Sequence, residues 1–372
     1  MPARTTLLSM SEHPGTAGHP LRVAIIGSGP SGFYAAQSLF AREDLAVEIE
    51  MFDRLPTPFG LVRGGVAPDH QKIKSVTKAY DRIAAHPDFR FHGNVALGRD
   101  ISREDLLSYH HAVIYAVGAS SEWRLGIPGE HLPGSHAAAE FVGWYNAHPD
   151  FGRLSFDFSA AGAAVIGNGN VAIDVARTLA STPERLREGD MADHAIAALD
   201  ESEVRTIHVL GRRGPAQAAF TTKELRELTG MPDVDVIVDP ADLEFDDLTR
   251  RWIEETPDGP RDRNIALMRE IAETAPPGSP RQIVFRFLVS PTGIVGDGRV
   301  AGLEIGHNSL AADDSGTPRP RLGEEREILD VGLVFRAIGY LGEPIAGLPF
   351  DRRGGTVPNA AGRVLDGQEV VP

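Results

Sequence analysis

The sequence contains no cysteine. This absence excludes a disulfide framework, a zinc site built on thiolates, an iron–sulfur cluster held by the chain's own cysteines, and a Cys-x-x-Cys redox pair. We accordingly predict no metal site. Any electrons that pass through this protein must therefore use an organic cofactor.

Long apolar runs and an excess of positive charge are missing too. No apolar segment approaches the roughly 20 residues that a membrane-spanning helix requires. Residues 1–20 lack the apolar centre of a signal peptide and contain Glu12, so we expect a disordered tail, with a degenerate transit peptide as the alternative. The formal net charge of −15 argues against nucleic-acid binding. These features predict a cytoplasmic protein without a membrane span.

Glycine and proline are abundant, with 40 and 27 residues in a chain of 372. A chain of this length has room for two or three domains with their own cores. Such a supply of turn-forming residues suits a fold in which many strands and helices alternate.

The stretch LRVAIIGSGPSGFYAAQSLF begins as an apolar strand, turns through Gly27, Gly29 and Gly32, and continues as a helix. The next apolar strand ends in Asp53, about 20 residues after the third glycine. In such a unit the glycines permit a tight turn, a close approach of a pyrophosphate and close helix–strand packing, while the acid binds a ribose. We therefore predict a dinucleotide site here.

A second unit of this kind begins at AAVIGNGNVAIDVARTLA. Its turn is Gly167-Asn168-Gly169-Asn170, and Ala172 stands where a third glycine is usual. Two units favour an α/β chain with two dinucleotide-binding, Rossmann-like domains.

The second unit departs from the first where its next strand ends. The apolar segment 204–209 is followed by Arg212 and Arg213, at a place where an NAD-binding fold usually carries an acid. Arginine offers a fork of donors that matches phosphate oxygens, so we predict a site for the 2′-phosphate of NADP(H). The alternative is a pair of surface arginines in a turn.

Three further residues keep two interpretations each. His70 follows Asp69, which could cap a helix over 69–80. This histidine either lies near a cofactor or a docking face, or it is a plain surface histidine. Asp174 serves the second site, or it satisfies the helix dipole or pairs with Arg177. Glu224 hydrogen-bonds ribose hydroxyls or only neutralises charge.

The sequence resembles the adrenodoxin reductase type of ferredoxin–NADP reductase, especially its bacterial members. The resemblance covers about residues 21–364. The segments that carry it are GSGPSGFYAAQ, PTPFGLVRGGVAPDH, FRFHGNVALG, IPGEHLPGSHAAAEFVGWYNAHP, VIGNGNVAIDVARTL, GRRGPAQAAFTTKELREL, VFRFLVSP and FRAIGYLGEPIAGLPFD.

This resemblance implies a two-domain fold in which the second domain is inserted into the first. An FAD-binding domain would comprise 21–120 and 330–372, and an NADP-binding domain would comprise 121–329. The implied FAD contacts are Gly27, Gly29, Ser31, Gly32, Asp53, Leu61 and Val95. The implied NADP(H) contacts are Gly167, Asn168, Gly169, Asn170, Val171, Arg212, Arg213 and Glu224.

The resemblance also implies an activity. His70 and Asp174 match a polar pair near the flavin and nicotinamide, and Arg226 matches a residue for docking an acidic iron–sulfur partner. The expected enzyme is a monomeric ferredoxin–NADP(+) reductase that moves hydride from NADPH to flavin and then single electrons to a ferredoxin. Without cysteine, disulfide reduction of the thioredoxin- or glutathione-reductase kind is excluded for this chain unaided.

One departure from the family opens an alternative. The family continues past GRV into a further strand and a helical region, whereas this sequence ends at Pro372. The alternative expectation is therefore a truncated, non-catalytic nucleotide-binding remnant.

Overall fold

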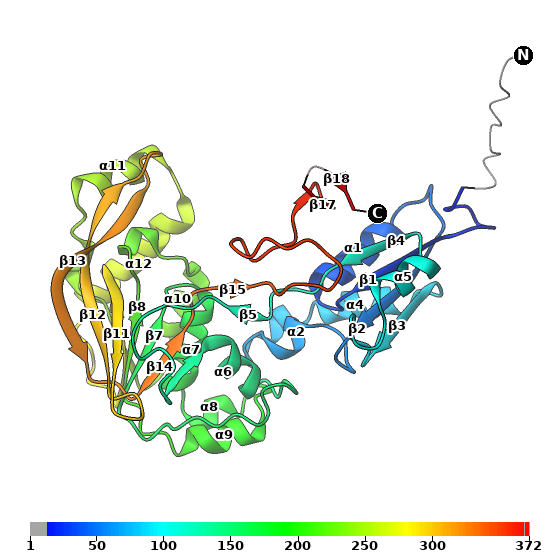
Figure 1. Cartoon of the computed structure of the whole chain (residues 1–372). Helices are drawn as coiled ribbons and strands as arrows, with labels where there is room; N and C mark the ends of the chain where they lie inside the picture. Colours follow the sequence, from blue (N-terminus) through cyan, green and yellow to red (C-terminus); the bar gives the residue numbers. More distant parts are fainter. Residues whose placement is uncertain (1–12, 368, 372) are drawn as a thin grey trace, which may run out of the picture. The chain divides into compact units, whose positions relative to one another are not determined.

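The computed structural model describes residues 13–367 and 369–371. The chain divides into two compact units, each of which is described by itself (Figure 1). Unit 1 comprises the chain up to Val66, His70–Glu122, and the chain from Tyr340 onward. Unit 2 comprises Ala67–Asp69 and Trp123–Gly339, so it is inserted into unit 1.

Unit 1 is built on a four-stranded parallel sheet of order β3-β2-β1-β4. Its strands are β1 (Leu21–Ile26), β2 (Val47–Asp53), β3 (Phe89–Gly93) and β4 (Ala112–Tyr115). Helices α1 (Pro30–Phe40) and α4 (Thr77–Ala84) pack on one face through Phe33 and Tyr80. Helix α5 (Arg103–Tyr109) packs Leu106 against the other face. A strand covered on both faces needs apolar residues on both of its sides, which explains the buried apolar run VAII at residues 23–26.

The remaining elements of unit 1 are short. They are α2 (Leu61–Gly64), α3 (Gln71–Lys74), β5 (Ser121–Glu122), β15 (Tyr340–Leu341), β16 (Asn359–Ala360), β17 (Arg363–Asp366) and β18 (Glu369–Val370). The last three form a small antiparallel sheet, and β5 pairs with β15.

Unit 2 is built on a six-stranded parallel sheet of order β6-β14-β7-β8-β10-β9. Its strands are β6 (Ser135–Ala137), β7 (Gly162–Ile166), β8 (Thr206–Leu210), β9 (Val234–Ile237), β10 (Arg281–Arg286) and β14 (Leu333–Arg336). Its helices are α6 (Ala138–Tyr145), α7 (Asn170–Ala180), α8 (Pro183–Leu186), α9 (Asp193–Asp200), α10 (Thr222–Thr229), α11 (Asp247–Glu255), α12 (Gly259–Glu273) and the 3₁₀ turns η2 (Pro215–Gln217) and η3 (Pro240–Leu243).

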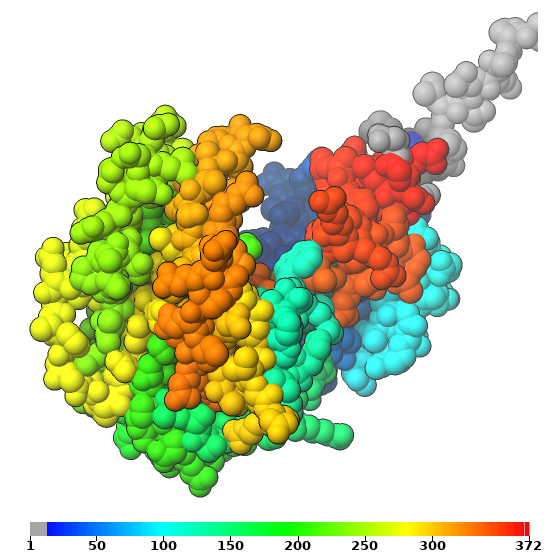
Figure 2. All heavy atoms as spheres, turned by 60° about the vertical axis from the view of Figure 1, so that its left-hand side comes forward, coloured from blue at the N-terminus to red at the C-terminus, as the bar shows by residue number. Residues whose placement is uncertain are grey.

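Alternate residues of β7 face two different layers, as the two-residue period of a strand requires. Ala163 and Val165 pack in the large core made with the helices. Ala164 and Ile166 pack in a second core with an antiparallel meander. The meander consists of β11 (Val289–Val295), β12 (Gly302–Ala312) and β13 (Pro318–Leu329), which Figure 2 shows in yellow to orange. Unit 2 therefore has three layers.

The α/β architecture with two Rossmann-like units is confirmed, with some boundaries shifted. The domain boundary expected at residue 330 differs from the structure, because β14 pairs with β6 and β7 inside the sheet of unit 2. The helix expected over 69–80 is instead two helices, α3 and α4, separated near Ser75 and Val76. In the described part of the chain, no helix has both the length and the apolar character needed to cross a membrane.

The expected disordered tail falls partly on residues 1–12, which lie outside the described residues. Residues 13–20 do not fit that expectation. The amide of Ala46 donates to the carbonyl of Gly15 at 2.8 Å, and Thr16 forms an isolated β-bridge with His19. These hydrogen bonds fasten the segment to unit 1.

Candidate nucleotide-binding sites

The glycine turn of unit 1 can be made only by glycine. Gly27 has φ +101°, and a Cβ there would lie 2.3 Å from the carbonyl oxygen of Ala116. A Cβ at Gly32 would lie 2.2 Å from the carbonyl oxygen of Gly27. Gly29 precedes α1 with no side-chain cap, and the first turn of α1 has no acidic residue. The first amides of α1 therefore remain available for a phosphate.

Asp53 is placed by β2 beside this turn. One carboxylate oxygen accepts hydrogen bonds from the amide and hydroxyl of Ser28, at 2.9 and 2.5 Å, and the other accepts from the amide of Leu55 at 2.9 Å. The amide of Val95 donates to the Asp53 carbonyl at 2.9 Å. A carboxylate has about four acceptor positions, so the half-buried Asp53 keeps capacity for a ribose hydroxyl.

Apolar side chains lie exposed near the same turn. Leu61 is 58% exposed and Val117 is 46% exposed. Phe59 holds a left-handed backbone with φ 93°, and its amide donates to the Ser28 carbonyl at 2.9 Å. Ser31 lies exposed in the first turn of α1. The phosphate turn, the acid and the exposed apolar surface together fit a large ligand with a flat hydrophobic end, as FAD is.

The glycine turn of unit 2 has the same construction as the glycine turn of unit 1. Gly167 has φ +130°, and a Cβ there would lie 2.3 Å from the carbonyl oxygen of Ala337. Gly169 precedes α7 without a side-chain cap, and a Cβ there would meet no atom within 4 Å. The open space over Gly169 is where a pyrophosphate can approach the backbone. Val171, in the first turn of α7, is only half-buried and packs against the large core.

Two hydrogen bonds tie this turn to the segment after β8. The Asn168 carbonyl accepts from the amide of Ala219 at 3.1 Å, and Oδ1 of Asn170 accepts from the amide of Thr221 at 2.8 Å. The phosphate turn and the segment that follows the arginines are therefore held together.

A cavity of about 550 Å³ joins the predicted residues of unit 2. Its lining includes Gly167, Asn168, Gly169, Arg212 and Arg213, together with Trp123, Arg124, Leu125, Val289, Pro291 and Ile338. The glycine turn and the two arginines, which are more than 40 residues apart in the sequence, thus share one cavity at the carboxyl edge of the sheet.

Hydrogen bonds hold the backbone of the arginine pair, whereas no carboxylate among the described residues neutralises its charge. Nδ2 of Asn308 donates to the Arg212 carbonyl at 2.9 Å, and the amide of Leu288 donates to the Arg213 carbonyl at 3.2 Å. Partial burial lowers the pKa of Arg213, and the like charges of Arg212 and Arg319 act in the same direction. Among the described residues neither Arg212 nor Arg213 forms a salt bridge with a carboxylate. Such a cluster favours a bound anion.

Asp174 belongs to a buried ion cluster within unit 2. The Arg177 side chain is 4% exposed and donates to both Asp69 and Asp174, the latter at 2.9 Å. Burial opposes the charged guanidinium, but the hydrogen bond and charge of Asp69 and the charge of Asp174 raise the pKa of Arg177. Asp69 therefore binds Arg177, and the Arg177-pairing interpretation of Asp174 is confirmed.

The two other uncertain residues are buried. His70 is 8% exposed and occupies the N-cap position of α3, with its carbonyl accepting the amides of Ile73 and Lys74. Glu224 is 5% exposed in α10, with Oε1 at 3.8 Å from Nζ of Lys223. Glu224 is not in the lining of the cavity that holds the arginines. The catalytic roles of His70 and Asp174 stay predictions.

Sequence reasoning missed Arg319 and Arg124. Arg319 lies on β13 and adds its charge to that of Arg213. Arg124 lines the cavity from the segment before β6. Neither residue stands in a motif, so no local signal could have identified it.

Known proteins resemble the chain over most of its length. The family model of pyridine nucleotide-disulphide oxidoreductases matches residues 21–237. The NADPH-ferredoxin reductase FprA of Mycobacterium tuberculosis is 49% identical over 349 residues, which cover 93% of this chain and 76% of FprA. The mitochondrial NADPH:adrenodoxin oxidoreductase of Arabidopsis thaliana is 41% identical, over 93% of this chain and 73% of that protein.

The structural comparison agrees. A structure of Mycobacterium tuberculosis FprA in complex with NADPH matches with a TM-score of 0.89 at 49% identity, covering 93% of this chain and 76% of that one. The chain therefore belongs to the adrenodoxin reductase type of ferredoxin–NADP reductases, within the pyridine nucleotide-disulphide oxidoreductases.

Proposed function

We propose that unit 1 binds FAD, that unit 2 binds NADP(H), and that the protein passes hydride equivalents from NADPH as single electrons to a ferredoxin-type iron–sulfur protein. Bound FAD would supply the chemistry that converts a two-electron hydride into two single electrons. The observation that carries the proposal is the uncompensated Arg212–Arg213 pair in one cavity with a phosphate-binding glycine turn.

For NADP(H), the chain supplies donors at two phosphate positions. The amides at the start of α7 would hold the pyrophosphate above Gly169. Arg212 and Arg213 would hold the 2′-phosphate, which NADH lacks, and would thereby select the phosphorylated coenzyme. The arrangement of both groups in one cavity supports this assignment.

For FAD, the residues of unit 1 would bind rather than react. The start of α1 would hold the pyrophosphate, and Asp53 would accept a ribose hydroxyl. Leu61 and Val117 would lose their exposed apolar surface to the ligand. We further propose that His70 and Asp174 act beside the reacting groups, with Arg177 orienting the Asp174 carboxylate.

The relatives support the choice of partner. FprA is named an NADPH-ferredoxin reductase, and the Arabidopsis thaliana relative is named an NADPH:adrenodoxin oxidoreductase. A ferredoxin-type iron–sulfur protein is accordingly the proposed acceptor.

Anaerobic reduction tests the proposal. The purified protein should carry flavin absorbance, and stoichiometric NADPH should bleach it without oxygen, faster than NADH at equal concentration. A colourless protein that still binds NADPH would favour the non-catalytic alternative. A flavoprotein that NADPH and NADH reduce equally well would contradict the assignment of the arginines.

A further inference from the structure

One wall of the cavity that joins the glycine turn of unit 2 to the arginines is a short segment, residues 123–126, which we call the wall loop. The wall loop belongs to no helix or strand, and Trp123, Arg124 and Leu125 line the cavity. The amide of Trp123 donates to the carbonyl of Gly339 at 3.3 Å, which fastens one end of the loop. A loop without regular backbone hydrogen bonds opens easily unless side chains hold it.

Glu130 binds the wall loop. Its side chain is almost completely buried, at 4% exposure. Oε1 accepts a hydrogen bond from the amide of Leu125 at 2.6 Å, and Oε2 accepts one from the amide of Gly126 at 2.9 Å. Gly126 has φ +70°, a left-handed conformation that glycine adopts easily and that lets successive amides point at one anion. One buried carboxylate therefore fixes two successive amides of the wall loop.

Arg336 balances the charge of Glu130 and connects it to the sheet. Nε of Arg336 lies 3.7 Å from Oε1 of Glu130, and Nη1 of Arg336 donates to Oγ of Ser135 at 2.7 Å. Arg336 ends β14, where its register partner in β7 is Ile166, the residue before Gly167. The wall loop is thus tied, through Glu130 and Arg336, to the strand beside the glycine turn.

The carboxylate of Glu130 cannot be replaced by an amide without loss. Burial opposes its charge, but the amides of Leu125 and Gly126 and the charge of Arg336 together lower the pKa of Glu130. Each carboxylate oxygen accepts from one of the two amides, whereas a glutamine side chain has a single acceptor oxygen. Glu130→Gln therefore leaves one amide of the wall loop facing an NH₂ group, which destabilises this position of the loop.

We propose that Glu130 is a positioning residue for coenzyme binding, which keeps the wall loop in the conformation that forms the cavity wall. Glu130 is not itself among the residues that line the cavity. Molecules with the loop in place bind the coenzyme tightly, so the apparent affinity scales with their fraction. The inference rests on the proposed NADP(H) function and adds a residue that acts without touching the coenzyme.

Equilibrium titration of an acid-to-amide variant tests this role. In Glu130→Gln, the affinities for NADPH and NADH should both fall about tenfold, because one amide loses its partner and fewer molecules have the wall in place. The NADPH to NADH ratio should stay at its wild-type value, since Arg212 and Arg213 are unaltered. A loss confined to NADPH would show an effect on the arginines and would contradict the role of the wall.

The matched control is Asp235→Asn. Asp235 is 6% exposed, and its Oδ2 accepts the amides of Gly278 and Ser279, both at 3.0 Å. It is thus another buried carboxylate that holds two successive amides of a loop, but neither Asp235 nor that loop lines the coenzyme cavity. Asp235→Asn should lower the stability of unit 2 and leave both affinities unchanged, so it isolates the effect of destabilisation.

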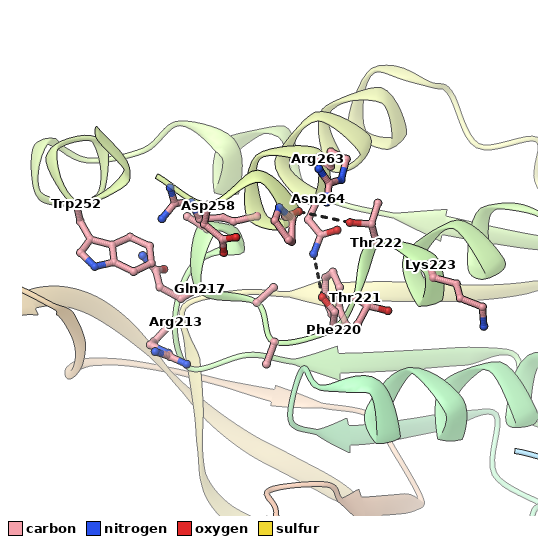
Figure 3. A pocket seen from close by; sticks show the side chains of 15 residues that line it. Arg213, Gln217, Phe220, Thr221, Thr222, Lys223, Trp252, Asp258, Arg263 and Asn264 are labelled. Carbon is pink, nitrogen blue, oxygen red and sulfur yellow. Dashed lines mark hydrogen bonds between the residues drawn. The ribbon is translucent and has the colours of Figure 1, made fainter. Parts of the chain in front are cut away.

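Tryptophan fluorescence reports on the wall loop without any coenzyme. Of the three tryptophans, Trp123 is 40% exposed and Trp144 only 3%. Trp252 lines a second cavity, which shares Arg213 with the first (Figure 3). The Trp123 signal is obtained by subtracting the signal of Trp123→Phe in each background. Acrylamide should quench that signal more strongly in Glu130→Gln than in the wild type, and Asp235→Asn should not differ from the wild type.

Gly126→Ala alters the same loop without changing Glu130, and it decides the question if Glu130→Gln does not fold. A side chain at φ +70° is strained, and no atom lies within 4 Å of the added Cβ, so the strain falls on the loop itself. This variant should weaken NADPH and NADH binding by equal factors.

Wild-type affinity for both coenzymes in folded Glu130→Gln, or in Gly126→Ala where that variant decides, would overturn the inference. Failure of the proposed function shows instead as an NADPH to NADH ratio near one in the wild type, and Glu130→Gln is then compared on either coenzyme. A wild type that binds neither coenzyme would overturn both.

Discussion

The two units build their glycine turns alike but end the following strand with opposite charges. In unit 1, β2 ends in Asp53, whose carboxylate accepts hydrogen bonds from Ser28 in the turn. In unit 2, β8 leads to Arg212 and Arg213, which share a cavity with the turn and form no salt bridge among the described residues. Under the proposed function, the turn would provide amides for a phosphate in both units, and the end of the next strand would distinguish a ribose hydroxyl from a ribose phosphate.

The two strand ends also differ in what they do for the fold. Asp53 is hydrogen-bonded by Ser28 and Leu55, so it holds the turn together before any ligand arrives. Within the described part of the chain, the charges of the arginines have no such partner, and they repel each other. Substitution of Asp53 should therefore lower stability, whereas substitution of Arg212 and Arg213 should weaken coenzyme binding without lowering stability.

The largest expected effect comes from removing both arginines. In Arg212→Ala/Arg213→Ala, NADPH affinity should fall about 100-fold while NADH affinity changes by less than threefold, because two charge-assisted contacts worth about 1.5 kcal/mol or more each disappear. Equilibrium titration of both coenzymes measures this. Arg187→Ala, which removes an exposed arginine near Glu184 and Asp200, is the matched control. Equal losses for the two coenzymes would refute the 2′-phosphate assignment.

The glycines of the turn should divide into folding and binding residues. Gly167→Ala should lower the free energy of unfolding by about 1–3 kcal/mol, because its φ of +130° is unsuited to a side chain. Gly169→Ala should leave unfolding nearly unchanged and weaken NADPH binding, because its Cβ would enter the space over the turn. Thermal unfolding and NADPH titration of both variants check this. A Gly169→Ala protein with wild-type affinity would show that no phosphate approaches there.

Asp53→Asn should destabilise unit 1, whereas substitution of the arginines should not destabilise unit 2. The amide oxygen can still accept from Ser28, without the charge, but the amide nitrogen then faces the Leu55 amide and cannot accept from it, so the change should cost about 1–3 kcal/mol. Denaturant unfolding of flavin-free protein measures this loss. Arg212→Ala/Arg213→Ala should show no such loss. Equal destabilisation of the two variants would remove the contrast between the strand ends.

The smallest expected effect concerns Arg319. Its charge adds to the field at Arg213, but it also pairs with Asp313 at 2.7 Å and is half-exposed. Arg319→Ala should weaken NADPH binding two- to threefold at low salt and less at high salt, because solvent ions screen exposed charges. Titrations at two ionic strengths test this. A loss that is independent of salt would indicate a direct contact instead.

Local patterns were enough to predict the glycine turns and the strand ends of each strand–turn–helix unit. The glycines at 27 and 167 were identified because a tight turn imposes a backbone that only glycine adopts easily. Asp53 and the arginine pair were identified because they follow buried strands, and parallel strands bring their carboxyl ends to one edge. The expected two-unit α/β fold followed from the same repeated pattern.

Contacts between distant segments were not predictable in this way. The sequence suggested Asp69 as a helix cap, whereas it binds Arg177 more than 100 residues away. The strand β14 was expected in the first domain, but its backbone completes the sheet of unit 2. Arg319 acts at Arg213 only because the meander folds over the six-stranded sheet.

The sequence by itself determined where the two glycine turns lie and which sign of charge follows the second strand of each unit, because turn geometry and strand ends are local properties of the chain. Only the tertiary structure decided which residues share a cavity with Arg213, and which carboxylates hold Arg177. Those outcomes depend on burial and on contacts across the sheet, and no short segment encodes either.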